Sequence, residues 1–204
     1  SRGLGDVYKR QVYPIEKDNE SKGKEDILQK VQKSKNSPAK ELLDISLDAE
    51  EYTVTFVANG QTVTRKALFD WSKEDNERIR YYSGTAIYKT TFPWKYKEQK
   101  DRQVYLHLGT VYNLATVRVN GIDCGTVWTA PYRADITAAL KKGTNELEIE
   151  VTNTWANALK GTDEGKAPFE GIWTNAKYRK QENTLLPGGL LGPLYFCLLY
   201  TSPS

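Results

Sequence analysis

The sequence predicts an all-β protein: an antiparallel β-sandwich of the jelly-roll kind, with a short charged segment at its N-terminus. Short segments of alternating polar and apolar residues recur along the chain, as strands with one buried face do. Asn59-Gly60 and Asn120-Gly121 are typical of hairpin turns. Strand patterns do not alternate with long helical patterns, which argues against the βαβ order of a Rossmann-like fold.

In the first half of the chain, the earliest predicted strand is Tyr52–Phe56, whose alternate residues are apolar. After the Asn-Gly turn, Gln61–Arg65 is expected to return as its partner. Leu68–Trp71 is expected to lead, as a strand or a loop, into a turn. Ala86–Phe92 is rich in β-forming residues, and we expect this strand to stop at Pro93.

The second half predicts three more strands before a helical turn. They are Val104–Leu108, Ala115–Val119 and Cys124–Trp128. One helical turn is expected next, with Asp135 or Thr137 as its N-cap and Gly143 as its terminating glycine.

The last part of the pattern contains a strand, a long segment and a final strand. Leu147, Ile149 and Val151 are expected to face inward, with the glutamates between them facing out. Residues 153–183 show weak periodicity, and a loop of this length in a compact domain is usually functional or disordered; its aromatic residues argue against disorder. Leu185–Phe196 is apolar and is interpreted as the final strand.

Composition limits the function. The chain has 204 residues, with 29 Lys+Arg against 26 Asp+Glu and a net charge of +3, and the opposite charges are interleaved, which argues against a nucleic-acid partner. With 39% hydrophobic and 27% charged residues it is globular rather than disordered. It has no long apolar run, so no membrane partner is expected. One His and two Cys exclude a Cys/His zinc site.

The two ends differ in character from the rest. Residues 1–11 and 197–204 have no helix or strand period and resemble translated sequencing adapter, so we set them aside from the fold. Residues 12–45 are interpreted as a linker or the tail of a preceding domain, with Lys24–Lys35 spaced for one short helix. The jelly roll is then expected over 46–196. The chain contains no Met, which suggests a piece of a longer reading frame.

Four motifs follow one another in the central part of the chain. They are Ser83–Tyr88, Val117–Gly125, Trp128–Thr137 and the stretch Gly143–Asn157. In this order they resemble the sugar-binding, galactose-binding-like jelly roll of glycoside hydrolase family 2 relatives. The resemblance is closer to the C-terminal β-sandwich of the large bacterial α-L-rhamnosidases of glycoside hydrolase family 106. It covers residues 47–196, although Gly188 stands where a serine is expected.

The resemblance implies that a catalytic (β/α)8 barrel of the same polypeptide is the first partner of this domain, and it assigns no catalytic residue to this chain. It implies a carbohydrate as the second partner, a glycan containing rhamnose or galactose. It also implies a periplasmic or extracellular location. No cofactor is expected, apart from the structural Ca²⁺ that jelly rolls of this superfamily often hold, and the chain has no Asp-x-Asp-x-Asp-Gly loop.

Sugar recognition uses aromatic faces together with amide, carboxylate and Arg groups. The residues that we expect to bind carbohydrate are Trp128, Arg133, Asn153, Trp155, Asn157 and Asp163, the last four by resemblance. Other roles remain open for some of them. Trp128 and Trp155 also suit anchors of the core or of a domain interface. Arg133 and Asp135 also suit a structural pair that holds the neighbouring turn.

Four other residues with chemically reactive side chains are not expected to take part in catalysis. Glu148 and Glu150 share a strand face, and the solvated face of an edge-exposed strand explains them better than a catalytic pair of carboxylates. His107 is expected at the surface or between the sheets, away from the face of its apolar neighbours. Cys124 is expected to be a buried small hydrophobe.

Three functions are compatible with these observations. The first is a non-catalytic accessory domain of a bacterial glycoside hydrolase, which supports the missing barrel and lends a loop to its substrate pocket. The second is an autonomous carbohydrate-binding module with 153–183 as its binding loop. The third is a purely structural domain whose aromatic residues bury an interface.

Overall fold

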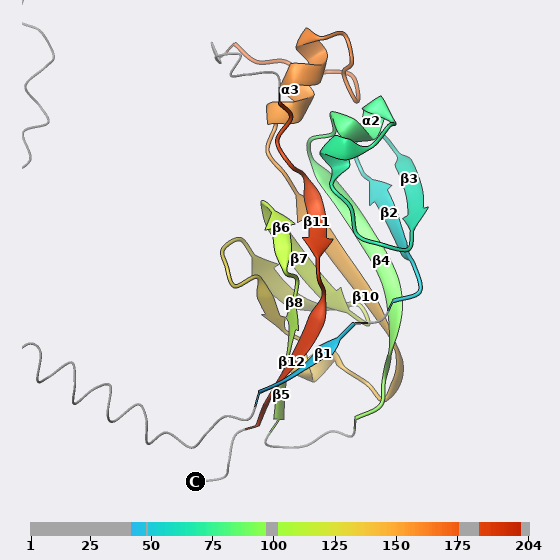
Figure 1. Ribbon diagram of the computed structural model, residues 1–204, viewed down its shortest axis with the longest axis vertical. Coiled ribbons are helices and arrows are strands. Elements are labelled where there is room, and N and C mark those ends of the chain that lie inside the picture. The colour runs from blue at the N-terminus through green and yellow to red at the C-terminus, as the bar shows by residue number, and fades with distance from the viewer. Residues whose placement is uncertain (1–41, 48, 97–101, 176–183, 201–204) are drawn as a thin grey trace, which may run out of the picture. The chain divides into compact units, whose positions relative to one another are not determined.

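The computed structural model of the chain describes residues 42–47, 49–96, 102–175 and 184–200. The described elements are mostly strands, arranged in antiparallel sheets with little helix (Figure 1). This arrangement confirms the predicted all-β sandwich. The helix predicted at Lys24–Lys35 lies outside the described residues.

Six strands form the larger sheet, in the order β3-β2-β4-β10-β7-β8. Their bounds are β2 Tyr52–Phe56, β3 Gln61–Arg65, β4 Thr85–Trp94, β7 Leu114–Val119, β8 Ile122–Val127 and β10 Gly143–Thr152. The two long strands β4 and β10 pair along their whole length, from Thr85 opposite Thr152 to Trp94 opposite Gly143. Both hairpins predicted from Asn-Gly pairs are confirmed, as β2–β3 and β7–β8.

Four strands form the second sheet, in the order β1-β12-β5-β9. Their bounds are β1 Leu42–Ser46, β5 Arg102–His107, β9 Arg133–Asp135 and β12 Tyr195–Tyr200. The strands β1 and β12 run antiparallel, with Leu42 opposite Leu199 and Ser46 opposite Tyr195. A separate two-stranded sheet consists of β6 Thr110–Tyr112 and β11 Gly189–Gly192.

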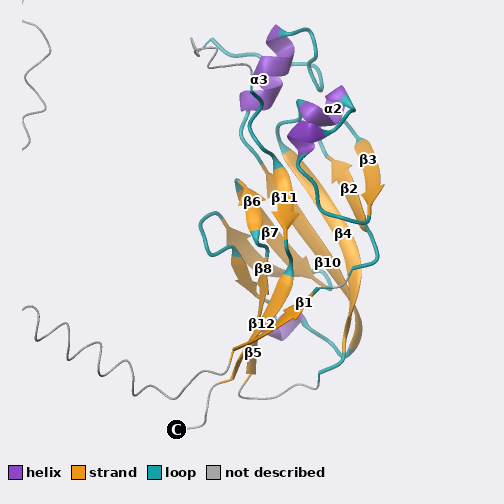
Figure 2. Ribbon diagram, viewed as in Figure 1, coloured by secondary structure: helices purple, strands orange, loops and turns teal. Residues whose placement is uncertain are grey.

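The helical segments in the described part of the chain are short. They are η2 Trp71–Lys73, α2 Glu77–Arg80, η3 Thr137–Ala139 and α3 Ala156–Asp163. Helices α2 and α3 lie at the same end of the sandwich (Figure 2), where the Tyr81 hydroxyl donates to the Glu164 carboxylate at 2.7 Å. The helix α3 falls within residues 153–183, where the sequence predicted no regular element.

The two main sheets bury the alternate residues of their strands. On the larger sheet these include Val54, Phe56, Ala86, Tyr88, Phe92, Val117, Leu147, Ile149 and Val151. On the second sheet they include Val104, Leu106, Phe196 and Leu198. Phe92 and Phe196 meet between the sheets, with ring centroids 5.0 Å apart. The alternation that predicted the strands is therefore the alternation that fills the core.

The sandwich is wider than the predicted range 46–196. Strand β1 begins at Leu42, inside the predicted linker 12–45, and β12 includes residues 197–200. Setting 197–200 aside from the fold was wrong. The strand β12 is paired on both sides, by β1 and β5, and most of its residues are buried. Such a strand is an apolar run without alternation, so its period is not visible.

Three local boundaries also differ from prediction. Strand β4 continues through Pro93, because β2 pairs with it only as far as Lys89 and the missing N–H of proline is tolerated where a neighbour is absent. The helical turn η3 ends at Ala139, and Gly143 begins β10 with a φ of +97° instead of ending a helix. The predicted final strand divides at Pro193 into β11 and β12.

Candidate functional site

Exposed aromatic side chains occur at the end of the sandwich that carries α2 and α3. Trp155 immediately precedes α3, is 56% exposed, and meets the Phe169 ring edge-on with centroids 6.1 Å apart. Trp173 is 80% exposed and directly follows Ile172, which lines the same hollow as Phe169. Large exposed apolar groups that lie together commonly mark a binding or docking surface. We call the surface formed by Trp155, Phe169 and Trp173 the aromatic end.

Asn153 and Asn157, two of the predicted sugar-binding residues, hold the backbone beneath this end. The Asn153 amide donates to the Tyr82 carbonyl at 3.1 Å and accepts from the Gly84 N–H at 2.8 Å. The Asn157 side chain is buried, and it exchanges two hydrogen bonds with the backbone of Leu186, at 2.7 and 2.9 Å. The structure thus gives both amides a positioning role, joining the start of α3 to distant segments.

Two charged residues of α3 also belong to this end. Asp163, a predicted sugar-binding residue, is the last residue of α3 and is exposed. The ammonium nitrogen of Lys160 is buried, and among the described residues it has no hydrogen-bond partner. A buried ammonium group without an acceptor is energetically costly. We therefore expect an acceptor that the described residues do not supply.

Trp128 and Arg133, the other predicted sugar-binding residues, belong to different elements. Trp128 follows β8 and is 68% exposed, so it is not a core anchor. The Arg133 guanidinium lies over the ring of Tyr105, 5.2 Å from its centroid. The adjacent turn is held by Asp135, which accepts hydrogen bonds from the N–H and hydroxyl of Thr137 at 2.9 and 2.6 Å. The described contacts therefore do not join these two residues to the aromatic end.

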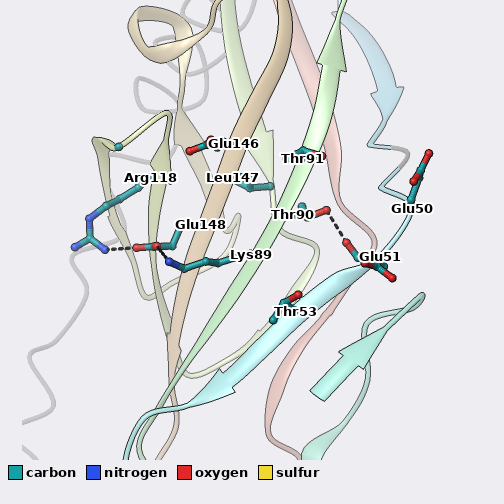
Figure 3. A pocket seen from close by; sticks show the side chains of 11 residues that line it. Glu50, Glu51, Thr53, Lys89, Thr90, Thr91, Arg118, Glu146, Leu147 and Glu148 are labelled. Carbon is teal, nitrogen blue, oxygen red and sulfur yellow. Dashed lines mark hydrogen bonds and ion pairs between the residues drawn. The ribbon is translucent and has the colours of Figure 1, made fainter. Parts of the chain in front are cut away.

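A groove of about 480 Å³ lies on the solvent-facing side of the larger sheet (Figure 3). Its centre is one row of residues in register across β2, β4, β10 and β7. The row consists of Thr53, Lys89, Glu148 and Arg118. We call this feature the sheet groove. The sequence alone does not reveal this groove. The alternation of polar and apolar residues shows which side chains of a strand face outward, but not which strands are neighbours.

Glu148 is the centre of an ion-pair network in the sheet groove. Its carboxylate lies 3.0 Å from Lys89 Nζ and 3.1 Å from the Arg118 guanidinium (Figure 3). The same guanidinium also pairs with Glu150. The hydrogen bond from Lys89, with a further contribution from Arg118, holds the pKa of Glu148 below its ordinary value despite the opposing effect of burial.

The prediction that Glu148 and Glu150 lie on an edge-exposed strand was wrong, because β10 is paired on both sides, by β4 and β7. Their orientation toward solvent is as expected. Both carboxylates bind the Arg118 guanidinium. The general acid of a glycosidase needs a raised pKa, and the pKa shift of Glu148 has the opposite sign.

His107 and Cys124 take up half-buried positions. The His107 ring stacks on the ring of Tyr195 with centroids 4.6 Å apart, and its Nδ1 lies 3.1 Å from the Tyr195 hydroxyl. Burial, and secondly the nearby Arg133 charge, lower the pKa of His107. Cys124 is only half-buried, which corrects the expected buried position. It lies in β8, an edge strand of the larger sheet, where one side of the strand has no neighbour.

No group of three or more His, Cys, Asp or Glu side chains in the described part of the chain is placed to hold a metal ion. The structural Ca²⁺ therefore stays a prediction without a site. None of the described helices is long and apolar enough to cross a membrane.

Proteins named as glycosidases are among those similar to this chain. A putative β-glucuronidase of Formosa agariphila is 36% identical over 174 residues, covering 72% of this chain. The structure of a rhamnosidase from Novosphingobium sp. PP1Y matches 79% of this chain, with a TM-score of 0.72 and 33% identity. The crystal structure of Ruminococcus gnavus β-glucuronidase in complex with uronic isofagomine matches 80% with a TM-score of 0.54 and 18% identity, which shows a shared fold.

The chain spans only a small part of these proteins: 15% of the Formosa protein, 16% of the rhamnosidase and 29% of the Ruminococcus enzyme. Residues 62–185, more than half of the chain, match the family described as the glycosyl hydrolase 2 galactose-binding domain-like family. The chain therefore belongs to the family of glycosyl hydrolase 2 galactose-binding-like domains.

Proposed function

We propose that this chain is a non-catalytic accessory domain of a bacterial glycoside hydrolase of the α-L-rhamnosidase kind, related to glycoside hydrolase family 106. Its aromatic end packs on the catalytic part of the same polypeptide, and the enzyme works in the periplasm or outside the cell. The 33% identity to the Novosphingobium rhamnosidase supports this choice of parent enzyme. The Formosa relative, a putative β-glucuronidase, makes a β-glucuronidase parent the alternative.

The exposure of two indole rings at the aromatic end supports this assignment most directly. Trp155 and Trp173 expose most of their side chains there, and the buried Lys160 ammonium has no acceptor among the described residues. A docking domain would cover the two indole rings. Two large apolar side chains exposed on one surface favour a protein interface over separate exposed groups.

The test compares the 204-residue chain with the full-length parent enzyme. In the parent enzyme, the double variant W155A/W173A is expected to lower the melting temperature and the turnover of polymeric substrate. The same substitutions are expected to change the stability of the 204-residue chain by less than about 0.5 kcal/mol each, as surface substitutions do. The matched control is Trp128→Ala, which removes an exposed indole outside the aromatic end.

Two results would contradict the proposal. The first is turnover of aryl rhamnosides or glucuronides by the 204-residue chain alone. The second is a parent enzyme in which W155A/W173A and Trp128→Ala behave alike. Loss of stability in the parent enzyme without loss of turnover would favour the purely structural interface domain.

An autonomous carbohydrate-binding module is the second candidate. A hollow of about 700 Å³ beside the aromatic end is bordered by Phe169, Arg78 and Glu170, which supply an aromatic face and charged hydrogen-bonding groups. Calorimetric titration of the chain with rhamnose, galactose and pectin-derived oligosaccharides tests it. Binding that is lost in Trp155→Ala would support an autonomous module, and absence of binding by the folded chain would exclude it for these sugars.

A further inference from the structure

The sheet groove has the dimensions of a small-molecule site. Its volume of about 480 Å³ lies within the range of roughly 300–1,000 Å³ that such sites occupy. It is formed on strands of a paired sheet, and rigid elements hold binding groups more accurately than loops do. It lies on the solvent-facing side of the larger sheet, on β2, β4, β10 and β7, whereas the aromatic end belongs to α3 and the segment that follows it.

The groups along the groove alternate in hydrogen-bonding character. Lys89 offers N–H donors, Glu148 offers acceptors, and Arg118 offers donors again, on three neighbouring strands. Neighbouring strands lie about 4.8 Å apart, so these groups follow one another at a regular spacing. Thr53 extends the row on β2 with a hydroxyl group that both donates and accepts. A ligand with several hydroxyl groups matches such a row.

The row is also fixed before a ligand arrives. Glu148 is held from two sides, by Lys89 and by Arg118, at 3.0 and 3.1 Å. Arg118 is held in turn by a second carboxylate, that of Glu150. Side chains that are already ordered lose little conformational entropy when they bind, which favours binding.

The net charge of the groove around Lys89, Glu148 and Arg118 determines whether it favours neutral or anionic ligands. Glu148 is neutralised by its two cationic partners, whereas Glu50, Glu51 and Glu146 line the groove as further carboxylates. The groove is therefore acidic overall, and it repels uronates and sulfated sugars. No aromatic side chain is among the residues that line it, so the affinity must come from hydrogen bonds.

We propose that the sheet groove binds a neutral saccharide, with millimolar affinity, at a site separate from the aromatic end. Hydroxyl groups of the sugar bridge Lys89, Glu148 and Arg118, each accepting from a cation or donating to the carboxylate. This proposal adds a binding site to the accessory domain and does not depend on the interface at α3.

The experiment is an NMR titration of the ¹⁵N-labelled 204-residue chain with rhamnose, galactose and neutral oligosaccharides, and in parallel with oligogalacturonate. We expect neutral sugars to shift amide signals around Lys89, Glu148 and Arg118, and oligogalacturonate to shift them at least tenfold less at equal concentration. Glu148→Gln keeps the shape but removes the charge-assisted contacts, so we expect at least tenfold weaker binding. The control is Glu74→Gln, because Glu74 also pairs with an arginine, Arg65, at 2.9 Å but does not line the groove. The sugar affinity of this variant is expected to change less than threefold.

Other outcomes overturn the proposal. Equal losses of affinity in Glu148→Gln and Glu74→Gln would mean that removing an ion-paired carboxylate acts on the fold and not on a ligand. Absence of shifts in the groove, or stronger binding of oligogalacturonate, would exclude a neutral-sugar site. Shifts confined to Trp155 and Trp173 would place the sugar at the aromatic end instead. The interface proposed for the parent enzyme would survive any loss of the groove, because its test measures W155A/W173A in the full-length protein.

Discussion

The hydroxyl oxygen of Tyr88 accepts a hydrogen bond from the indole nitrogen of Trp71, at 2.6 Å, inside the fully buried core. It also accepts from the Leu190 N–H at 3.1 Å. One hydroxyl therefore joins three segments that are distant in sequence: η2, β4 and β11. Burial raises the pKa of Tyr88 far above its ordinary value and so favours the neutral phenol.

Tyr88→Phe removes this acceptor and leaves the N–H groups of Trp71 and Leu190 unpaired in the core. We expect it to lower the free energy of unfolding by about 1–3 kcal/mol, the cost of leaving buried donors unsatisfied. Urea unfolding measures the difference. Tyr105→Phe is the control, because that half-buried phenol only reaches Gln103, at 3.5 Å. Equal effects of the two variants would show that the core hydroxyl contributes nothing specific.

Gly189 and Gly143 offer a matched pair of substitutions. Both have a strongly positive φ, +100° and +97°, which disfavours any side chain. A Cβ at Gly189 would collide with the Trp71 indole, whereas a Cβ at Gly143 meets open space. We expect Gly143→Ala to cost about 1–2 kcal/mol from backbone conformation alone. Gly189→Ala is expected to cost roughly 1–3 kcal/mol more, because the core is overpacked. Similar melting temperatures for the two variants would contradict the close approach of Gly189 and Trp71.

The side chain of Asn153 is expected to stabilise the folded state. Asn153→Ala leaves the Gly84 N–H and the Tyr82 carbonyl without their side-chain partner, so we expect a loss of about 1–3 kcal/mol in thermal or urea unfolding. Trp155→Ala, two residues away on the exposed surface, serves as the comparison and is expected to change stability far less. A sugar affinity that falls in Asn153→Ala without any loss of stability would restore the role expected from the sequence.

His107 is the single histidine of the chain, so its titration can be followed by NMR without ambiguity. We expect its pKa to lie below the ordinary value of about 6.5, because burial and the Arg133 charge both disfavour the imidazolium. Removing that charge in Arg133→Ala is expected to raise the pKa, whereas the distant Arg78→Ala should leave it unchanged. A pKa that is the same in Arg133→Ala and in the unsubstituted chain would exclude the electrostatic contribution.

The lowered pKa of His107 also fixes the sign of its effect on stability. The unfolded chain binds the proton first as the pH falls, so the contribution of neutral His107 is complete above about pH 6.5 and is lost as the pH falls through the folded-state pKa. In Arg133→Ala, this loss is expected to become smaller.

The strands could be predicted where one face is buried and the other is solvated. In β10, Leu147 and Ile149 alternate with Glu148 and Glu150, and both the strand and its inward face follow from that pattern. The helix α3 could not be predicted in this way. It contains Gly161, a weak helix former, whose backbone packs directly against Tyr81. Its formation depends on this tertiary contact, which a local pattern does not contain.

In the candidate sites too, some residues could be identified from the sequence and others only from the fold. The exposed Trp155 could be found from its residue type and its place in an aperiodic segment. The buried amide of Asn157 could not be told from a sugar-binding amide, because only the fold brings Leu186 to it. The row Lys89–Glu148–Arg118 needed the order and register of three strands, which depend on pairings between residues far apart in the chain.

The pairing of β1 with β12 has a mechanical consequence. Leu42, where β1 begins, lies opposite Leu199, near the end of β12. These two residues therefore lie next to each other at one end of the four-stranded sheet. A pulling force applied at Leu42 and Leu199 would separate β1 from β12 one residue pair at a time. Separation would begin at the Leu42–Leu199 pair and end at the Ser46–Tyr195 pair. This edge of the domain therefore offers little resistance to tension applied at these two residues, whereas the ten-residue pairing of β4 and β10 lies in the other sheet.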